Sequence, residues 1–451
     1  MNRNGSRPRN GYRPHAERME DRYLLSAPPQ VNSTFLYLEP LAYPADRPDT
    51  PILPFGTVPK TATFVDPSVR IVHGAHVAIG SQTFVGPYAT LNASTGAIKI
   101  GSGSVIDDNA VIISNPTNAI PTTSVTIGDG VVIGFGATVL GPSTIGAFTP
   151  KGSKPTAPKP VEIGANALID GATVMPGSIV GALARIGPGV TVPSGVRVLP
   201  GVNITTDAEA TDPALGKVVP ITTSDLDAVT SLLTDGKALA VGYATLYEGN
   251  SATGASPAVG ANTKVYNGDL ATIEGASAEP GSTNGVSFEP TNPVYPAFLA
   301  PNGALVQAGL YNFRARVTGQ VYFQARAGVV AHHLGHANAI RADEGQPISF
   351  ASYVTTGNNV TINSPVGGTV AVGTGVQIQD NAVILGGPKT STAISNNVTV
   401  GTGAVINDSS IYAGVTIGAR AYISNSTIAA NTNVPAGAII VDNVQVGTIE
   451  W

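Results

Sequence analysis

The sequence has no cysteine, few charged residues and no long apolar run. None of the 451 residues is Cys and only 12% are Asp, Glu, Lys or Arg, against about 25% in an average domain. Without Cys the chain has no disulfide, no thiolate metal ligand and no cysteine nucleophile. No stretch approaches the roughly 20 apolar residues that a membrane-spanning helix needs, so we expect no membrane span.

The charge balance also limits the partners. The chain has 24 basic residues against 29 acidic ones, a net charge of −5. It therefore lacks the basic surface that neutralises nucleic-acid phosphates, and we expect no nucleic-acid partner.

Glycine and proline are abundant instead. The chain has 53 Gly, 35 Pro and a hydrophobic share of 42%. This share is too high for a disordered chain. The composition and length predict a turn-rich, all-β protein of two or three domains.

Aliphatic residues recur at every sixth position in two long stretches. A helix repeats at 3.6 residues and a single strand at 2, so this period fits short strands joined by tight corners. Three hexads make one coil. Stacked coils place equivalent residues on neighbouring strands about 4.8 Å apart, which forms parallel sheets around a narrow aliphatic prism. The runs are Val65–Ile71–Val77, Ile79–Val85–Leu91, Ile100–Ile106–Ile112, Ile127–Ile133–Val139–Ile145, Val192–Val198–Ile204, Ile394–Val400–Ile406, Ile411–Ile417–Ile423 and Ile428–Val434–Ile440–Val446.

The runs divide the chain into four parts. We predict an N-terminal arm and lead-in over 1–60, a first hexapeptide solenoid over 61–205, and a second over 305–451. The connection, 206–304, has an apolar helical face that begins near Ser224 and Asp225 and is expected to stop near Gly236. A second helical piece is expected over 238–247, followed by a stretch rich in Gly, Pro and Ser.

Residues 1–26 of the N-terminal arm carry six Arg without the apolar core of a secretory signal peptide. Residues 17–26, ERMEDRYLLS, resemble the LExRxLLS motif of exported planctomycete-type proteins. The resemblance implies an extracellular or cell-envelope location and a possible role at the cell surface. The alternative is a solvated basic arm.

Two segments of the second solenoid carry a more specific pattern, 340–347, IRADEGQP, and 376–384, VQIQDNAVI. They resemble the γ-class carbonic anhydrases, within the hexapeptide-repeat (isoleucine patch) acyltransferase superfamily. The resemblance implies left-handed parallel β-helices, a homo-trimer or similar assembly, and a zinc at the subunit interface. Residue by residue, it makes Arg341 and Asp343 the interface ion pair beside the metal, and Gln379 the polar residue near the metal-bound water.

The zinc ligands of that family do not carry over. Its three His positions fall on Leu385, Thr402 and Asn407 in the second solenoid, and on Ile113, Phe135 and Leu140 in the first, where Asp107 takes the Gln position. A catalytic zinc needs three protein ligands and an open position for water. Without the ion, nothing lowers the pKa of that water to about 7. We therefore expect the usual zinc site to be degenerate.

Three His residues precede the ion pair. If His332, His333 and His336 lay on a helical turn, His332 and His336 would share one face, a spacing that suits a metal. We favour the alternative that they are polar residues at an edge of the solenoid. His73 and His76 are expected at a surface corner, and Asp107–Asp108 and Asp343–Glu344 are expected to be solvated corner acids rather than cation ligands.

Three functions remain open. The first is an exported β-solenoid pseudoenzyme with a structural or interaction role and no cofactor, and we favour it because the ligands are lost. The second is a zinc-dependent carbonic anhydrase with ligands relocated to the three His residues. The third is a hexapeptide acyltransferase, which only the repeat supports because no His in the regular coils suits the catalytic base.

Overall fold

The computed structural model describes residues 63–66, 68–114, 124–148, 159–253, 332–343, 348–365, 367–387 and 391–451, together with short strands between 294 and 323. The predicted N-terminal arm and its motif lie outside these residues. Both solenoids lie within one compact unit, Tyr37–Trp451.

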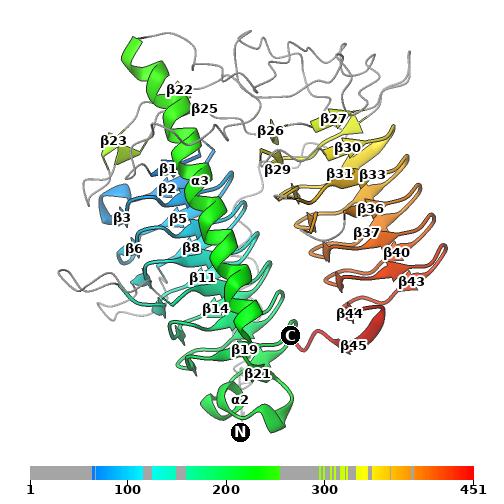
Figure 1. Cartoon of the computed structure of the whole chain (residues 1–451), viewed down its shortest axis with the longest axis horizontal. Coiled ribbons are helices and arrows are strands. Elements are labelled where there is room, and N and C mark those ends of the chain that lie inside the picture. The colour runs from blue at the N-terminus through cyan, green and yellow to red at the C-terminus, as the bar shows by residue number, and fades with distance from the viewer. Residues whose placement is uncertain are drawn as a thin grey trace, which may run out of the picture. The chain divides into compact units, whose positions relative to one another are not determined.

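The first solenoid consists of three sheets whose strands follow one another around each coil (Figure 1). Sheet 1 contains β1 (Phe64–Val65), β4 (Phe84–Val85), β7 (Val105–Ile106), β10 (Val131–Ile133), β13 (Val161–Ile163), β16 (Ile179–Val180), β19 (Val196–Val198) and β21 (Val218–Pro220). Sheet 2 contains β2 (Arg70–Val72), β5 (Thr90–Asn92), β8 (Val111–Ile113), β11 (Thr138–Leu140), β14 (Leu168–Asp170), β17 (Arg185–Ile186) and β20 (Asn203–Ile204). Sheet 3 contains β3 (Val77–Ile79), β6 (Ile98–Ile100), β9 (Val125–Ile127), β12 (Ser143–Ile145), β15 (Thr173–Val174) and β18 (Thr191–Val192).

The second solenoid repeats this arrangement. Sheet 4 contains β26 (Ala315–Gly319), β29 (Asn338–Ala342), β32 (Thr361–Asn363), β35 (Val383–Leu385), β38 (Val405–Asn407), β41 (Tyr422–Ser424), β44 (Ala438–Val441) and β45 (Val444–Thr448). Sheet 5 contains β27 (Val321–Phe323), β30 (Ile348–Phe350), β33 (Val370–Val372), β36 (Thr392–Ile394), β39 (Ser410–Ile411) and β42 (Thr427–Ile428). Sheet 6 contains β28 (His332–His333), β31 (Val354–Thr356), β34 (Gln377–Ile378), β37 (Thr399–Val400), β40 (Thr416–Ile417) and β43 (Asn433–Val434).

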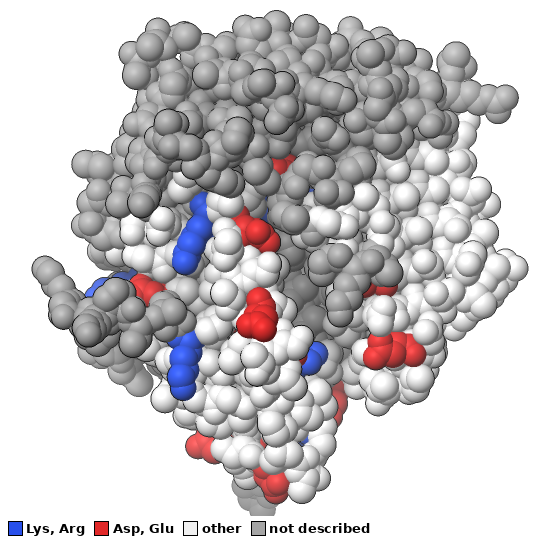
Figure 2. Space-filling model, viewed as in Figure 1, with Lys and Arg blue, Asp and Glu red and all other residues white. Residues whose placement is uncertain are grey.

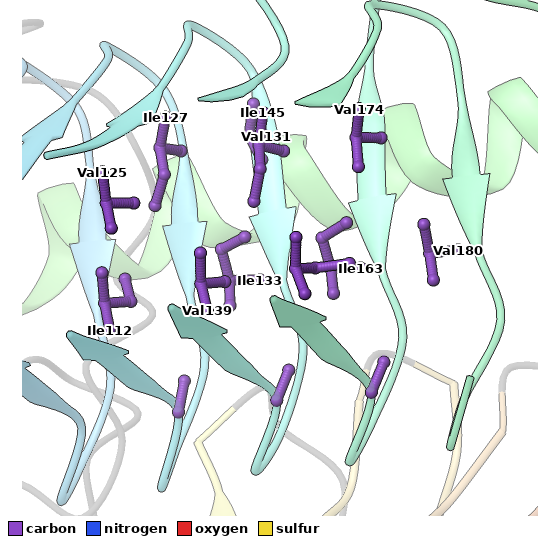
Figure 3. Close-up of a cluster of buried hydrophobic side chains, with 14 of the residues drawn as sticks. Ile112, Val125, Ile127, Val131, Ile133, Val139, Ile145, Ile163, Val174 and Val180 are labelled. Atoms are coloured by element: carbon purple, nitrogen blue, oxygen red, sulfur yellow. The ribbon is translucent and has the colours of Figure 1, made fainter. Parts of the chain in front are cut away.

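The predicted hexad residues form the core of each solenoid. Neighbouring coils pair in parallel register, so that Ile106, Ile133, Ile163 and Val180 stack along sheet 1. Figure 3 shows Ile133, Ile163 and Val180 in one row on successive coils. Each is fully buried, which confirms the two predicted β-solenoids.

Three hexad positions differ from the prediction. Ile71 and Ile440 are only partly buried. Val446 is 62% exposed because it lies on β45, which turns back antiparallel to β44 and ends the parallel ladder. At the end of the first solenoid, β21 pairs antiparallel with β19 in the same way. Such strands replace the ladder that the next coil would have continued.

The glycines that follow hexad aliphatics are needed for close backbone approach. A Cβ on Gly101 would lie 2.4 Å from the backbone carbon of Gly128 on the next coil, a distance that any side chain would prevent. The left-handed backbone conformation falls two residues later, at Gly103.

The connection contains one long helix. α3 (Thr223–Thr253) runs through Gly236 without a break and packs across β1, β4, β7 and β10. The predicted stop at Gly236 is therefore wrong. A Cβ there would lie 2.1 Å from a methyl carbon of Val105, so Gly236 lets the helix approach sheet 1 rather than ending it. Thr222, not Ser224, caps the helix, because its hydroxyl accepts the Asp225 backbone N–H.

The remaining elements are short. They are η1 (Gly74–His76), α2 (Asp207–Thr211) and η2 (Pro213–Leu215), together with β22 (Val294–Tyr295) paired with β25 (Gly309–Leu310) and β23 (Phe298–Leu299) paired with β24 (Leu305–Val306). Because the last two pairs are antiparallel, the coils of the second solenoid begin with β26 rather than at residue 305. Among the described helices, none is long and apolar enough to cross a membrane.

Candidate functional site at the seam between the solenoids

The two solenoids contact one another along a zone that we call the seam. Side-chain hydrogen bonds cross it from the Asn109 amide to the Thr361 hydroxyl, 2.9 Å, and from the Asn166 amide to the Gly403 carbonyl, 3.2 Å. Further along, the Trp451 indole N–H donates to the Leu183 carbonyl at 2.7 Å. Successive positions of the first solenoid thus meet successive positions of the second.

An apolar cluster fills the middle of the seam. It joins corner residues of the first solenoid to the outward face of sheet 4 in the second. Its members are Phe135, Ala165, Ala182 and Leu183 from the first solenoid and Val383, Leu385, Val405, Tyr422 and Ile449 from the second. Phe135 and Leu385 are two of the positions at which the resemblance requires zinc ligands, and both contribute to this cluster.

The other four positions at which the resemblance requires His ligands carry no His either. Asn407 follows Leu385 in register on the next strand, and Ile113 and Leu140 are neighbours on the outward face of sheet 2. Thr402 donates its backbone N–H and its hydroxyl to the Gln379 side-chain oxygen, each at 3.1 Å. Because four of the six positions carry Leu, Ile or Phe, these residues do not fit a zinc ion with three protein ligands.

A buried charged group lies at one level of the seam. The Arg341 guanidinium on β29 lies 3.0 Å from an Asp108 carboxylate oxygen and 3.4 Å from one of Asp343. Arg341 is 1% exposed and both Asp residues are 0% exposed. The guanidinium carbon also lies 5.0 Å from the ring centroid of Phe84. One arginine of the second solenoid thus pairs with carboxylates from both solenoids.

The predicted ion pair between Arg341 and Asp343 is present, but two expectations about the acids are wrong. Asp107 and Asp108 are buried, at 9% and 0% exposure, and are not solvated corner residues. Asp343 is buried as well. A general rule says that a buried charge needs a partner of opposite charge. The sequence could not show that Asp108 has such a partner, because Asp108 and Arg341 lie in different solenoids.

Burial raises the pKa of Asp108 from 3.8 to about 7. The Arg341 charge lowers this pKa, whereas the charges of Asp343 and Asp66 raise it further. Desolvation is the larger effect, because removing a carboxylate from water disfavours its charged form. Asp108 therefore changes its protonation state near neutral pH.

The described hydrogen bonds of the Gln379 side chain join it to Thr402 and not to the ion pair. Its side chain is exposed and ties the corner at Thr402, as described above. The structure thus brings Arg341 and Asp343 together, while the hydrogen bonds of Gln379 serve a corner between two coils.

The three predicted metal-binding histidines do not lie on a helical turn. His332 and His333 form β28, which pairs in parallel with β31, so the spacing argument for a shared helical face fails. Their side chains lie outside the described residues. The His336 backbone N–H donates to the Asn358 side-chain oxygen at 2.9 Å.

No other described residues suggest a metal site. In the part of the chain that the structure describes, no group of three or more His, Cys, Asp or Glu side chains is placed to hold a metal ion. His73, which precedes η1, and His76, its last residue, are exposed as predicted, with ring centroids 6.5 Å apart.

Solved structures match this chain only at low identity and low TM-score. No protein-family model and no curated protein matches the chain. A hexapeptide transferase family protein from Anaplasma phagocytophilum is 19% identical with a TM-score of 0.22, and the match covers 41% of this chain and 99% of that one. For a putative acetyltransferase from Bacillus cereus the values are 19%, 0.16, 40% and 95%.

A third solved structure is that of an acyltransferase. The UDP-N-acetylglucosamine acyltransferase of Francisella novicida is 16% identical with a TM-score of 0.16, and the match covers 41% of this chain and 78% of that one. Such TM-scores carry no argument about function. The coils themselves show that the chain is a hexapeptide-repeat β-solenoid.

Proposed function

We propose that the chain is a tandem β-solenoid with a structural or interaction role, in which contact between the solenoids has replaced a zinc site. One observation carries this proposal. Phe135 and Leu385, at two positions where the resemblance requires metal ligands, pack in one apolar cluster of the seam. The same contact that excludes a ligand set joins the two halves of the chain.

The chemistry of CO₂ hydration explains why this observation matters. The reaction needs a hydroxide at neutral pH, which a zinc ion supplies by lowering the pKa of its bound water to about 7. Aliphatic and phenyl side chains donate no electron pair to a metal. The charged residues that remain, Arg341 and Asp343, are buried against Asp108 and have no open face toward a substrate.

Two features support the proposed setting of this protein. The motif at residues 17–26 favours an exported or cell-surface protein. On the outward face of sheet 2, Ile113 and Leu140 remain half-buried side by side, and such an apolar sheet face favours burial against another copy of the chain. We therefore include a homo-oligomer in the proposal.

The variant Leu385→His tests the assignment of the lost site. It restores one of the three family ligands, so it should show no more CO₂ hydration than wild-type protein in a stopped-flow assay with added zinc, because Thr402 and Asn407 remain. Appreciable hydration by the variant alone would refute our assignment of the ligand positions.

The same assay separates the alternative functions. Zinc-dependent hydration by the wild-type protein that disappears in a His332→Ala, His336→Ala double variant would establish a relocated zinc site. Thiol release from acetyl-CoA by the wild-type protein would favour the acyltransferase. Either result would overturn a purely structural role.

A further inference from the structure

Each solenoid ends with an antiparallel strand, but the two strands differ. β21 pairs with β19 at the end of the first solenoid, and β45 pairs with β44 at the end of the second. Both are the last strands of their sheets, so the outer side of each has no described strand beside it. The main-chain N–H and C=O groups along such an edge can pair with a further strand unless something prevents it.

β21 is protected against such pairing. It is three residues long and ends in Pro220, which has no N–H to donate. The short helices α2 and η2 also pack on it. A short strand, a proline and covering elements are three devices by which proteins keep a sheet edge from recruiting another strand.

β45 is much less protected. Its five residues, VQVGT, include no Pro and no charged residue. Residues 442–446 are all exposed, with Val444 at 59% and Val446 at 62%. One device is present, a bulge: the register on β44 shifts between Ile439 and Ile440, so Val446 has no register partner there. An uncharged edge of this length with exposed valines is well suited to pair with another strand.

The sequence of β45 favours an identical strand as its partner. Val444-Gln445-Val446 reads the same in both directions. In an antiparallel pair of two such strands, related by a twofold axis at Gln445, Val444 of each copy lies opposite Val446 of the other. Cross-strand pairs of β-branched residues stabilise a sheet, and the two Gln445 side-chain amides face one another as donor and acceptor.

The acids that flank β45 select this register. A twofold axis at Val446 would place Asp442 of one copy opposite Glu450 of the other, and like charges directly opposite one another destabilise a strand pair. An axis at Gln445 instead places the uncharged Thr448 opposite Asp442. No acid then faces an acid along the length of β45.

We propose that β45 is the docking edge for a second copy of this chain, whose own β45 pairs with it in antiparallel orientation about Gln445. Sheet 4 of each copy then continues into sheet 4 of the other. Because only a few residues pair, we expect a reversible dimer with a dissociation constant in roughly the micromolar range. This contact uses a surface other than the outward face of sheet 2, and it does not depend on whether the chain is an enzyme.

Sedimentation equilibrium of the full chain at several concentrations measures this association. The wild type should associate reversibly. The double variant Val444→Lys, Val446→Lys places Lys opposite Lys at both valine pairs, so its dissociation constant should rise by about tenfold or more. Val444→Lys, Val446→Glu places Lys opposite Glu at the same pairs and should keep most of the association. Circular dichroism should show the wild-type fold in both variants, because the two valines are exposed.

Two further variants serve as controls. Val219→Lys changes an exposed valine of β21, the protected strand, and should associate as the wild type does. Ile113→Lys changes the outward face of sheet 2 and should leave the pairing of β45 intact. A wild type that stays monomeric at about 100 µM would overturn the proposal, as would association that Ile113→Lys abolishes and the double Lys variant does not. Equal losses in the Lys–Lys and Lys–Glu variants would overturn the pairing about Gln445.

Disulfide cross-linking gives a second readout of the register. The chain has no Cys, so a disulfide in a single-Cys variant must join two copies. In the proposed pair residue 445 faces itself across the axis, and the roughly 4.5–5.5 Å between the Cα atoms of opposed strand residues suits a disulfide. Mild oxidation should therefore link Gln445→Cys much faster than Thr448→Cys, whose position lies opposite Asp442. Equal rates of linking in the two variants would contradict a twofold axis at Gln445.

Discussion

Arg341 is the largest fully buried side chain of the described residues. Only 12% of the residues in the chain are charged. Figure 2 shows how sparse charged side chains are on the described part of one face. Burying Arg341 with Asp108 and Asp343 is therefore a specific feature of the seam. The sequence predicted the pair of Arg341 with Asp343, because two residues in one segment match a motif. It did not predict Asp108, because nothing local to a corner indicates which residue of the other solenoid will cover it.

Arg341→Met tests how much this charge contributes at the scale of one residue. The change removes the guanidinium that lies 3.0 Å from the buried Asp108 carboxylate, and breaking a buried pair in this way costs about 3–5 kcal/mol of unfolding free energy. Denaturant titration at about pH 8, above the raised pKa of Asp108, measures the loss. The control is Arg185→Met, because Arg185 forms a half-exposed pair with Asp170 at 3.5 Å and such a pair contributes only about 0–1 kcal/mol. Similar losses in the two variants would contradict the importance of the buried site.

At the scale of the element, α3 shows where sequence patterns stop being informative. Its apolar residues predicted a helix. The N-cap is Thr222, two positions before the expected Ser224, and the carboxylate of Asp225, which was expected at the helix start, accepts the Thr222 hydroxyl and backbone N–H. The predicted break was wrong because glycine signals either a helix end or a close approach, and only the packing partner decides between them. Here that partner is Val105 of sheet 1, which is remote in sequence.

Gly236→Ala therefore has an unusual expected sign. In an isolated helix alanine is favoured over glycine by about 1 kcal/mol, but here the new methyl group would meet Val105. We expect a net loss of about 1–3 kcal/mol from overpacking, measured by thermal or denaturant unfolding. Thr234→Ala, at an exposed position of the same helix, should be neutral or stabilising. A stabilised Gly236→Ala would show that α3 lies further from sheet 1 than described.

For the whole molecule, the hexad period predicted both solenoids because each coil repeats the same local packing problem. The contacts of the seam could not be predicted from this period. Its hydrogen bonds, apolar cluster and buried charges join residues of two different repeats, and one chain's periodicity holds no information about lateral contacts. The expectation that the zinc site is degenerate came from residue identity alone, because the side chains of Leu385 and Phe135 cannot bind zinc in any arrangement.

The last residues of the described chain fasten the seam at one end. The Glu450 carboxylate accepts the Asn203 backbone N–H at 2.9 Å and lies 3.1 Å from the Lys217 ammonium. Trp451→Ala removes the neighbouring indole contact, so we expect local opening there to become easier by about 1–2 kcal/mol. Hydrogen exchange should accelerate at β17, β20 and β44 while β7 and β8 remain unchanged. Uniform acceleration over the whole first solenoid would contradict a local fastening.

The most direct test of the central claim, that contact between the solenoids occupies the place of a zinc site, is the zinc content of the untagged protein. The measurement is elemental mass spectrometry after incubation with zinc and exhaustive dialysis. We predict far less than one zinc ion per chain, because the expected ligand positions are filled by side chains that cannot coordinate it. About one zinc ion per chain, retained through dialysis, would contradict the account and make the protein a metalloprotein with a rebuilt centre.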